Sequence, residues 1–347
     1  MITPPSLTRR PAGALPRTDT VAATDQRPHT RYRRGPGRLR VAVIGLGHMG
    51  RRHAAVLHRL DHVELAAVVD PAGDPHHAAG TAVLLPSIDD LARRHIDYAV
   101  LACPTAAHTA IGEELARLGI ATLIEKPLAH DLPAALRLQK AFTGSSATAA
   151  IGHIERFQPA VAAMRQLLAT GHLGDIAEIS TQRVSMHPGR ITDVGVTLDL
   201  AIHDIDLTSW LTGHRYTHIT ASTRHHLGHA HEDVLTATGH LTDGTIVTHR
   251  ANWLTPTATR LITITAGDGC LTADTRRNTL WHYQHHHSAP VPVLSGDPLT
   301  TEHHAFAALL EGHPSTIADL TAGVHAVAVA DAARQAAATG HPTTIPH

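Results

Sequence analysis

The chain contains 347 residues with a formal net charge of −1; 43% of the residues are hydrophobic and 17% are charged. At about 100 to 200 residues per domain this length predicts two domains, and the apolar share excludes a wholly disordered chain. No run approaches the ~18 apolar residues of a membrane span and no hydrophobic segment follows Arg9 and Arg10, so we expect a cytoplasmic protein without a membrane partner. Cys103 and Cys270 are too few for a disulfide framework, which agrees with a reducing compartment.

The first forty residues differ in composition from the rest of the chain. Residues 1–40 carry nine arginines, two aspartates and six prolines, and they show no apolar periodicity. Such a segment cannot bury enough apolar surface to offset the entropy lost on ordering, so we predict a disordered basic tail over residues 1–38. Without the charges of residues 1–40 the remainder has a net charge of about −8, which argues against a nucleic-acid partner.

From residue 39 short apolar runs alternate with amphipathic segments. The predicted strands are 41–44, 63–70, 98–102, 121–124 and 148–151, and the predicted helices between them are 48–60, 87–94, 109–118 and 132–141. Ser87 is the expected N-cap of the second of these helices. Alternation of strand and helix is typical of βαβ units, so residues 39–151 are predicted to form a Rossmann domain with a parallel sheet.

The pattern changes after residue 151, where longer segments rich in Thr, Val and Ile begin. The predicted strands are 176–183, 218–224, 235–241, 245–253, 260–266 and 270–274, and the predicted helices are 159–168, 300–310 and 317–339. Turn signals such as Asp243-Gly244 join neighbouring strands into hairpins. Residues 152–340 are therefore predicted to form an α+β domain with a largely antiparallel open sheet, and the fold class of the chain is α/β.

A glycine-rich turn connects the first predicted strand to the first predicted helix. Gly45, Gly47 and Gly50 have the G-x-G-x-x-G spacing of dinucleotide folds, in which a helix N-terminus faces the pyrophosphate. Asp70 ends the second strand, where a carboxylate accepts hydrogen bonds from the adenosine ribose and repels a 2′-phosphate. This predicts NAD rather than NADP; the alternative is a turn aspartate before Pro71.

Lysine is rare enough in this chain to be informative. Of the 29 Lys and Arg residues only Lys126 and Lys140 are lysines, and Lys126 lies in a Glu125-Lys126-Pro127 turn at the carboxyl end of a parallel strand. Ligands bind at that end of such sheets, and an ammonium can both donate hydrogen bonds and release a proton. We therefore expect Lys126 to be catalytic or to orient the substrate, whereas Lys140 is expected to be a solvated helix residue.

A second group of ionisable residues is Asp199 and His203. If the segment is helical, the two side chains lie on one face, and a histidine held by a carboxylate is a suitable general base. Asp206, one turn later, is expected to have a supporting role. Histidines number 32, so the tract 285–287 is expected to be a chance cluster and we predict no metal site.

Taken in order, these motifs resemble those of the Gfo/Idh/MocA oxidoreductases over about residues 39–337. The match rests on the glycine turn, Asp70, Glu125-Lys126-Pro127, Asp199-x-x-x-His203 and a Cys103-Pro104-Thr105-x-x-His108 loop. The resemblance implies a catalytic group of Lys126, Asp199 and His203. It implies cofactor contacts from Gly45, Gly47, His48, Met49, Gly50, Asp70, Cys103, Thr105, His108, Glu125 and Lys126.

Two further segments, 152–159 and 188–206, resemble the branch of that family that includes UDP-N-acetylglucosamine 3-dehydrogenases, with Gln158 where asparagine is usual. The resemblance implies an NAD-dependent dehydrogenase acting on a secondary alcohol of a sugar, nucleotide-linked, such as C3 of a UDP-N-acetylhexosamine, and a homodimer or homotetramer. The expected substrate contacts are Lys126, His153, Arg156, Arg183, Arg190, Asp199 and His203.

Three alternatives stay open at this stage. One is a cyclitol (inositol-type) dehydrogenase, and another is an epimerase or lyase that uses tightly bound NAD transiently. The third belongs to another class, a regulator that senses NAD without turnover, against which the intact Lys126, Asp199 and His203 argue.

Overall fold

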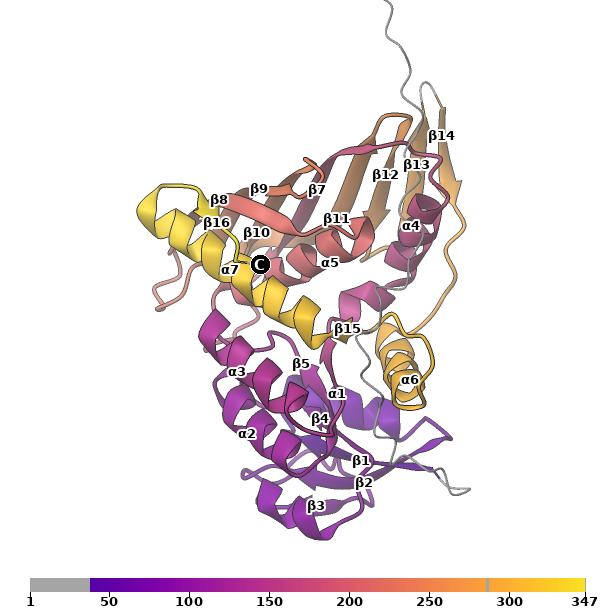
Figure 1. Cartoon of the computed structure of the whole chain (residues 1–347), viewed down its shortest axis with the longest axis vertical. Helices are drawn as coiled ribbons and strands as arrows, with labels where there is room; N and C mark the ends of the chain where they lie inside the picture. The colour runs from indigo at the N-terminus through magenta and orange to yellow at the C-terminus, as the bar shows by residue number, and fades with distance from the viewer. Residues whose placement is uncertain (1–37, 285–286, 347) are drawn as a thin grey trace, which may run out of the picture.

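A computed structural model of the chain describes residues 38–284 and 287–346. It contains two β-sheets, one in each half of the molecule (Figure 1). Apart from Arg38, the predicted basic tail lies outside the described residues, as do two residues of the histidine tract, His285 and His286.

The first sheet has seven strands in the order β15-β6-β5-β4-β1-β2-β3. Its six parallel strands are β1 (Leu39–Ile44), β2 (Val63–Val69), β3 (Val83–Leu85), β4 (Tyr98–Leu101), β5 (Ala121–Glu125) and β6 (Ala149–Gly152). The short β15 (Ala318–Asp319) pairs antiparallel with β6. The predicted Rossmann sheet is confirmed. Its strand order reverses between β1 and β4, where ligands bind in doubly wound sheets.

Helices cover both faces of this sheet. On one face α2 (Thr105–Arg117) packs with α3 (Leu132–Thr143) over the core that contains Leu101 and Leu138. The other face carries α1 (His48–Leu57) and also α6 (Pro298–Leu310), which joins the core around Tyr98 through Phe306. The second half of the chain thus returns to complete the first.

Local details of this half differ from the sequence prediction. Helix α2 begins four residues earlier than expected, directly after Pro104. Proline has no backbone N–H and is therefore tolerated at the start of a helix, where N–H groups have no partner within the helix. The segment Ile88–Arg93 is a 3₁₀ helix, and Ser87 accepts a hydrogen bond from the backbone N–H of Asp89 as expected of its N-cap.

The second sheet has nine strands in the order β14-β13-β12-β11-β7-β10-β9-β8-β16. They are β7 (Ile176–Met186), β8 (Tyr216–Arg224), β9 (Val234–Leu241), β10 (Ile246–Asn252), β11 (Leu254–Ala266), β12 (Gly269–Asp274), β13 (Thr279–Gln284), β14 (His287–Val291) and β16 (Thr343–Thr344). Only β7 and β10 pair in parallel, so the largely antiparallel sheet is confirmed. We did not predict β13, β14 or the short β16; β14 is an exposed edge strand that contains Pro290.

Three helices lie against this sheet, α4 (Pro159–Ala169), α5 (Ile202–Thr212) and α7 (Leu320–Thr339). Helix α7 contacts β8 and α5 in the upper half of Figure 1 and α3 in the lower half, so it fastens the two halves together. Two shorter helical segments, Ile154–Phe157 and Thr197–Ala201, lie where the halves meet. Among the described residues no helix is long and apolar enough to cross a membrane.

Candidate active site

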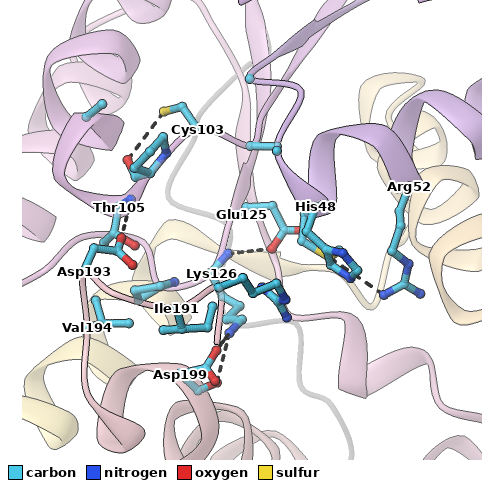
Figure 2. A pocket seen from close by; sticks show the side chains of 18 of the residues that line it. His48, Arg52, Cys103, Thr105, Glu125, Lys126, Ile191, Asp193, Val194 and Asp199 are labelled. Atoms are coloured by element: carbon cyan, nitrogen blue, oxygen red, sulfur yellow. Dashed lines mark hydrogen bonds and ion pairs between the residues drawn. The ribbon is translucent and has the colours of Figure 1, made fainter. Parts of the chain in front are cut away.

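A pocket of about 960 Å³ lies between the carboxyl ends of β1, β2, β4 and β5 and the segments around α5 and β7 (Figure 2). Most of the residues that we expected to contact cofactor or substrate line it. These are Gly45, Gly47, His48, Met49, Asp70, Cys103, Thr105, Glu125, Lys126, Arg183, Arg190, Asp199 and His203. The fold thus gathers motifs that are up to 158 residues apart, from Gly45 to His203, around one cavity.

The three glycines of the first turn occupy three different environments. Gly45 has φ +91°, a conformation that favours glycine, and a Cβ on Gly50 would lie 1.8 Å from the carbonyl oxygen of Gly45. A Cβ on Gly47 would meet nothing within 4 Å, and Gly47 is the N-cap of α1, where no side chain caps the helix. The free N–H groups of α1 therefore face open space beside the pocket, which fits a pyrophosphate.

Asp70 follows β2 and has two backbone partners. One carboxylate oxygen accepts from the N–H of Leu46 at 2.6 Å, and the other accepts from the N–H of Ala72 at 2.8 Å. The aspartate thus shapes its own turn and also fastens the glycine turn. It still lines the pocket, and a carboxylate oxygen has a second lone pair for a further donor.

The loop after β4 forms the next part of the wall. Burial raises the pKa of the Cys103 thiol to about 12, so this cysteine stays protonated at neutral pH. The Thr105 N–H donates to Asp193 at 3.3 Å, which joins the loop to the opposite wall. His108 does not line the pocket; its ring lies between the carbonyl oxygens of Pro127 and Cys103, at 3.0 and 3.1 Å, and links this loop to the Lys126 turn.

Lys126 reaches across the pocket to Asp199 (Figure 2). Its Nζ donates to the carboxylate Oδ1 and to the backbone oxygen of Asp199, both at 2.9 Å. Burial opposes ionisation of Asp199, but the Lys126 ammonium outweighs it and lowers the pKa of this carboxyl. Because an ammonium has three N–H groups, one stays available to a ligand in the pocket.

His203 lies one turn after Asp199 and is 8% exposed, toward the same pocket. The segment before it is a π-helix rather than the α-helix that we assumed, and α5 begins at Ile202. Such bulges occur at functional sites. Burial and the neighbouring cations, Lys126 first, hold the pKa of His203 well below its ordinary value. The imidazole is therefore neutral at neutral pH and can accept a proton.

The four residues expected to add substrate contacts divide into two pairs. Arg183 and Arg190 line the pocket, although Arg183 is also bound to Asp204 at 2.8 Å. Arg156 and His153 lie behind the wall. Arg156 donates two hydrogen bonds to Asp206 at 2.8 and 2.5 Å, so these two side chains pair with each other behind the wall.

We did not predict several residues that line the pocket. Arg52, Glu155, Asp193, Trp253 and Arg260 all line the pocket. Arg52 could have been found, because it lies one helical turn after His48 on α1. The others come from loops, strands and the short helical segment Ile154–Phe157, where no spacing rule applies. No group of three or more His, Cys, Asp or Glu residues that could hold a metal ion occurs in the described part of the chain.

Comparison with protein families decides the class of the site. The model of an oxidoreductase family with an NAD-binding Rossmann fold, Gfo/Idh/MocA, matches residues 39–153, and the model of the C-terminal domain of the same family matches residues 161–272. The chain belongs to the Gfo/Idh/MocA family. It is therefore an oxidoreductase. The pocket lies between its Rossmann half and its C-terminal half.

Individual relatives narrow the comparison. The chain is 30% identical to the UDP-N-acetylglucosamine 3-dehydrogenase of Acidithiobacillus ferrooxidans over 84% of this chain and 95% of that protein. A solved structure of that enzyme has a TM-score of 0.78 and covers 86% of this chain and 97% of its own. The WlbA dehydrogenase of Bordetella pertussis, solved with NADH and UDP-GlcNAcA, has the same fold at 19% identity, with a TM-score of 0.82 and coverage of 90% and 99%.

An inositol enzyme gives a shorter match. The chain is 33% identical to the myo-inositol dehydrogenase Hyg17 of Streptomyces leeuwenhoekii over 53% of this chain and 58% of that protein. The match to the UDP-N-acetylglucosamine 3-dehydrogenase thus covers more of both chains than the match to this inositol enzyme.

Proposed function

We propose that this oxidoreductase is an NAD-dependent dehydrogenase that acts on a secondary alcohol of a nucleotide-linked sugar. The observation that carries the proposal is the Lys126–Asp199 ion pair, which lies with neutral His203 in the same pocket as the glycine turn. The near full-length similarity to a UDP-N-acetylglucosamine 3-dehydrogenase supports the substrate class. The arginines of the pocket offer donors for a diphosphate.

The chemistry of the proposal uses three side chains. His203 takes the proton of the substrate hydroxyl, for which the depressed pKa provides the neutral imidazole. The remaining N–H of Lys126 donates to the same substrate oxygen, and Asp199 fixes the ammonium through its two contacts. Nicotinamide, when bound, supplies the hydride acceptor or donor.

The cofactor part of the proposal rests on the first wall. The uncapped N-terminus of α1 and the open space at Gly47 would hold the pyrophosphate. Asp70 would accept the ribose hydroxyls, and its charge would repel the 2′-phosphate of NADP, so we propose NAD as the cofactor.

The test is a thermal-shift screen of nucleotide sugars and cyclitols with NAD present, followed by turnover assays of the ligands that stabilise the protein. Net formation of NADH from a UDP-N-acetylhexosamine is expected. Conversion of the sugar without net NADH would instead indicate an epimerase or lyase. Stabilisation by inositol alone would favour a cyclitol dehydrogenase, and NAD binding without any turnover would favour a regulator.

Two further expectations belong to this proposal, a cytoplasmic location and a homodimer or homotetramer. Light scattering of the purified protein checks the second, because a mass of one chain, 36.9 kDa, would contradict it.

A further inference from the structure

A line of buried polar side chains leads from the pocket wall into the Rossmann half. Glu125 Oε1 lies 2.8 Å from His53 Nε2, His53 Nδ1 lies 3.0 Å from His303 Nε2, and His303 Nδ1 lies 3.2 Å from the Tyr98 hydroxyl. These residues come from β5, α1, α6 and β4, and none is more than 5% exposed. Only Glu125 lines the pocket.

The direction of the hydrogen bonds follows from their two ends. An ionised Glu125 can only accept, so His53 donates from Nε2, and in a neutral His53 ring Nδ1 is the acceptor. His303 then donates from Nε2, and its Nδ1 accepts from the Tyr98 hydroxyl. Burial raises the pKa of Tyr98, so its phenol stays protonated. Burial also holds the pKa of His303 well below its ordinary value, which agrees with a neutral imidazole.

Glu302, the residue before His303 on α6, is a second buried carboxyl beside this line. It has no exposed surface, and neither oxygen has a hydrogen-bond partner within residues 38–284 and 287–346. Burial and the charge of Glu125 raise its pKa well above the ordinary value. Burial opposes the ionisation of Glu125 as well, yet the hydrogen bond from His53 lowers the pKa of Glu125 overall. The surroundings of the two carboxyls therefore act in opposite directions, favouring ionisation of Glu125 and opposing that of Glu302.

We propose that His53 and His303 are positioning residues that keep one negative charge on Glu125 at the pocket wall, an inference that rests on the proposed function. We further infer that this charge makes the site bind oxidised nicotinamide cofactor in preference to the reduced form. The ring of the oxidised cofactor is a cation and the ring of the reduced one is neutral, so a fixed carboxylate attracts only the first. In the proposed function, Lys126 binds the oxygen of the substrate carbon that exchanges hydride with the nicotinamide ring. Because Glu125 directly precedes Lys126, the ring would lie near Glu125.

The experiment measures the dissociation constants of NAD⁺ and NADH separately, by calorimetry on the full chain without substrate. Glu125→Gln is expected to weaken NAD⁺ about tenfold relative to NADH, a change equivalent to about 1.4 kcal/mol. His53→Leu should shift the ratio in the same direction. His53→Gln, whose amide N–H can still donate to Glu125, should keep the ratio close to that of the unmodified protein.

Two variants act as matched controls, with melting temperatures recorded for all. Glu302→Gln replaces a buried carboxyl whose ionisation burial and the charge of Glu125 oppose, so the ratio should not change. His58→Gln alters the exposed histidine that caps the C-terminus of the same helix, where the ring hydrogen-bonds the Ala78 carbonyl, and should also be silent.

An unchanged ratio in both Glu125→Gln and His53→Leu would overturn the inference, and so would an equal shift in Glu302→Gln. In those cases the unmodified protein still binds NAD⁺ and the proposed function stands. Failure of the unmodified protein to bind either form of the cofactor would instead remove the proposed function, and with it the inference.

Discussion

The two walls of the pocket are built by different physical means. The wall of the Rossmann half presents backbone N–H groups at the glycine turn and at the N-terminus of α1, beside side chains such as Asp70 and Glu125. The opposite wall consists of buried charged side chains, such as Arg183 with Asp204, each about 3% exposed. Backbone N–H groups donate to a ligand at any pH. Paired ionisable side chains can instead exchange protons, and the charge of each one depends on its partner. In the proposed function the first wall binds the cofactor, the second supplies Asp199 and His203, and Lys126 connects the two.

The largest expected effect comes from removing the side chain of Lys126 or His203. His203→Ala or Lys126→Ala should lower turnover by about 10² to 10⁴-fold, the usual contribution of a positioned proton-transfer group, while NAD affinity stays nearly unchanged. Lys126→Arg should not restore activity, because a guanidinium is forked and does not release its proton. Steady-state kinetics and cofactor titration check both statements.

Lys140→Arg is the matched control, since Lys140 is the other lysine of the chain and lies on α3 away from the pocket. Full activity of Lys126→Arg would reduce Lys126 to a generic cation. Full activity of His203→Ala would place the base elsewhere.

The next effect concerns the stability of the charged wall. Arg156→Ala leaves Asp206 buried without its bidentate partner, which should cost about 3–5 kcal/mol of unfolding free energy. Urea denaturation measures this loss. Arg137→Ala, which breaks an exposed ion pair with Glu113, should be almost silent in the same assay. Equal losses in the two variants would show that burial does not set the value of these pairs.

The backbone wall can be tested with its glycines. Gly47→Ala places a Cβ in open space, so the melting temperature should stay within about two degrees while NAD affinity falls at least about tenfold. Gly50→Ala instead forces a Cβ against the Gly45 carbonyl and should lower the melting temperature, by overpacking of about 1–3 kcal/mol. A Gly47→Ala protein that binds NAD normally would exclude the pyrophosphate from this turn.

Cofactor choice is the smaller effect at the same wall. If Asp70 accepts the ribose hydroxyls, NAD should bind about tenfold more tightly than NADP, and Asp70→Ala should narrow that gap. The variant also loses the hydrogen bonds to Leu46 and Ala72, so affinity for both cofactors should fall, and only the ratio is diagnostic. Equal affinities in the unmodified protein would leave Asp70 with its turn role alone.

The sequence predicted the backbone wall better than the charged one, for a physical reason. Gly45, Asp70 and Lys126 lie at the ends of apolar strands, and parallel strands bring their carboxyl ends to one edge. The contacts of Arg156 with Asp206 and of Arg260 with Glu155 join residues 50 and 105 positions apart. No periodicity fixes such pairs, so their partners became visible only in three dimensions, as did the π-helix before His203.

The last prediction concerns pH, because neutral histidines are buried behind both walls. Burial lowers the pKa of His249 to about 3, and it holds the pKa values of His203 and His303 well below the ordinary one. Below a pH of about 6.5, the pKa of histidine in the unfolded chain, the unfolded chain binds protons at these histidines and the folded chain does not. The free energy of unfolding is therefore highest above that pH and falls as the pH decreases. Each such histidine contributes a slope of up to about 1.4 kcal/mol per pH unit. Urea denaturation between pH 7.5 and 5 should show a flatter slope for His249→Gln, by about one proton, than for the exposed-site control His172→Gln. The same slope in both variants would mean that His249 protonates in the folded protein, against its burial between Thr181 and Tyr216.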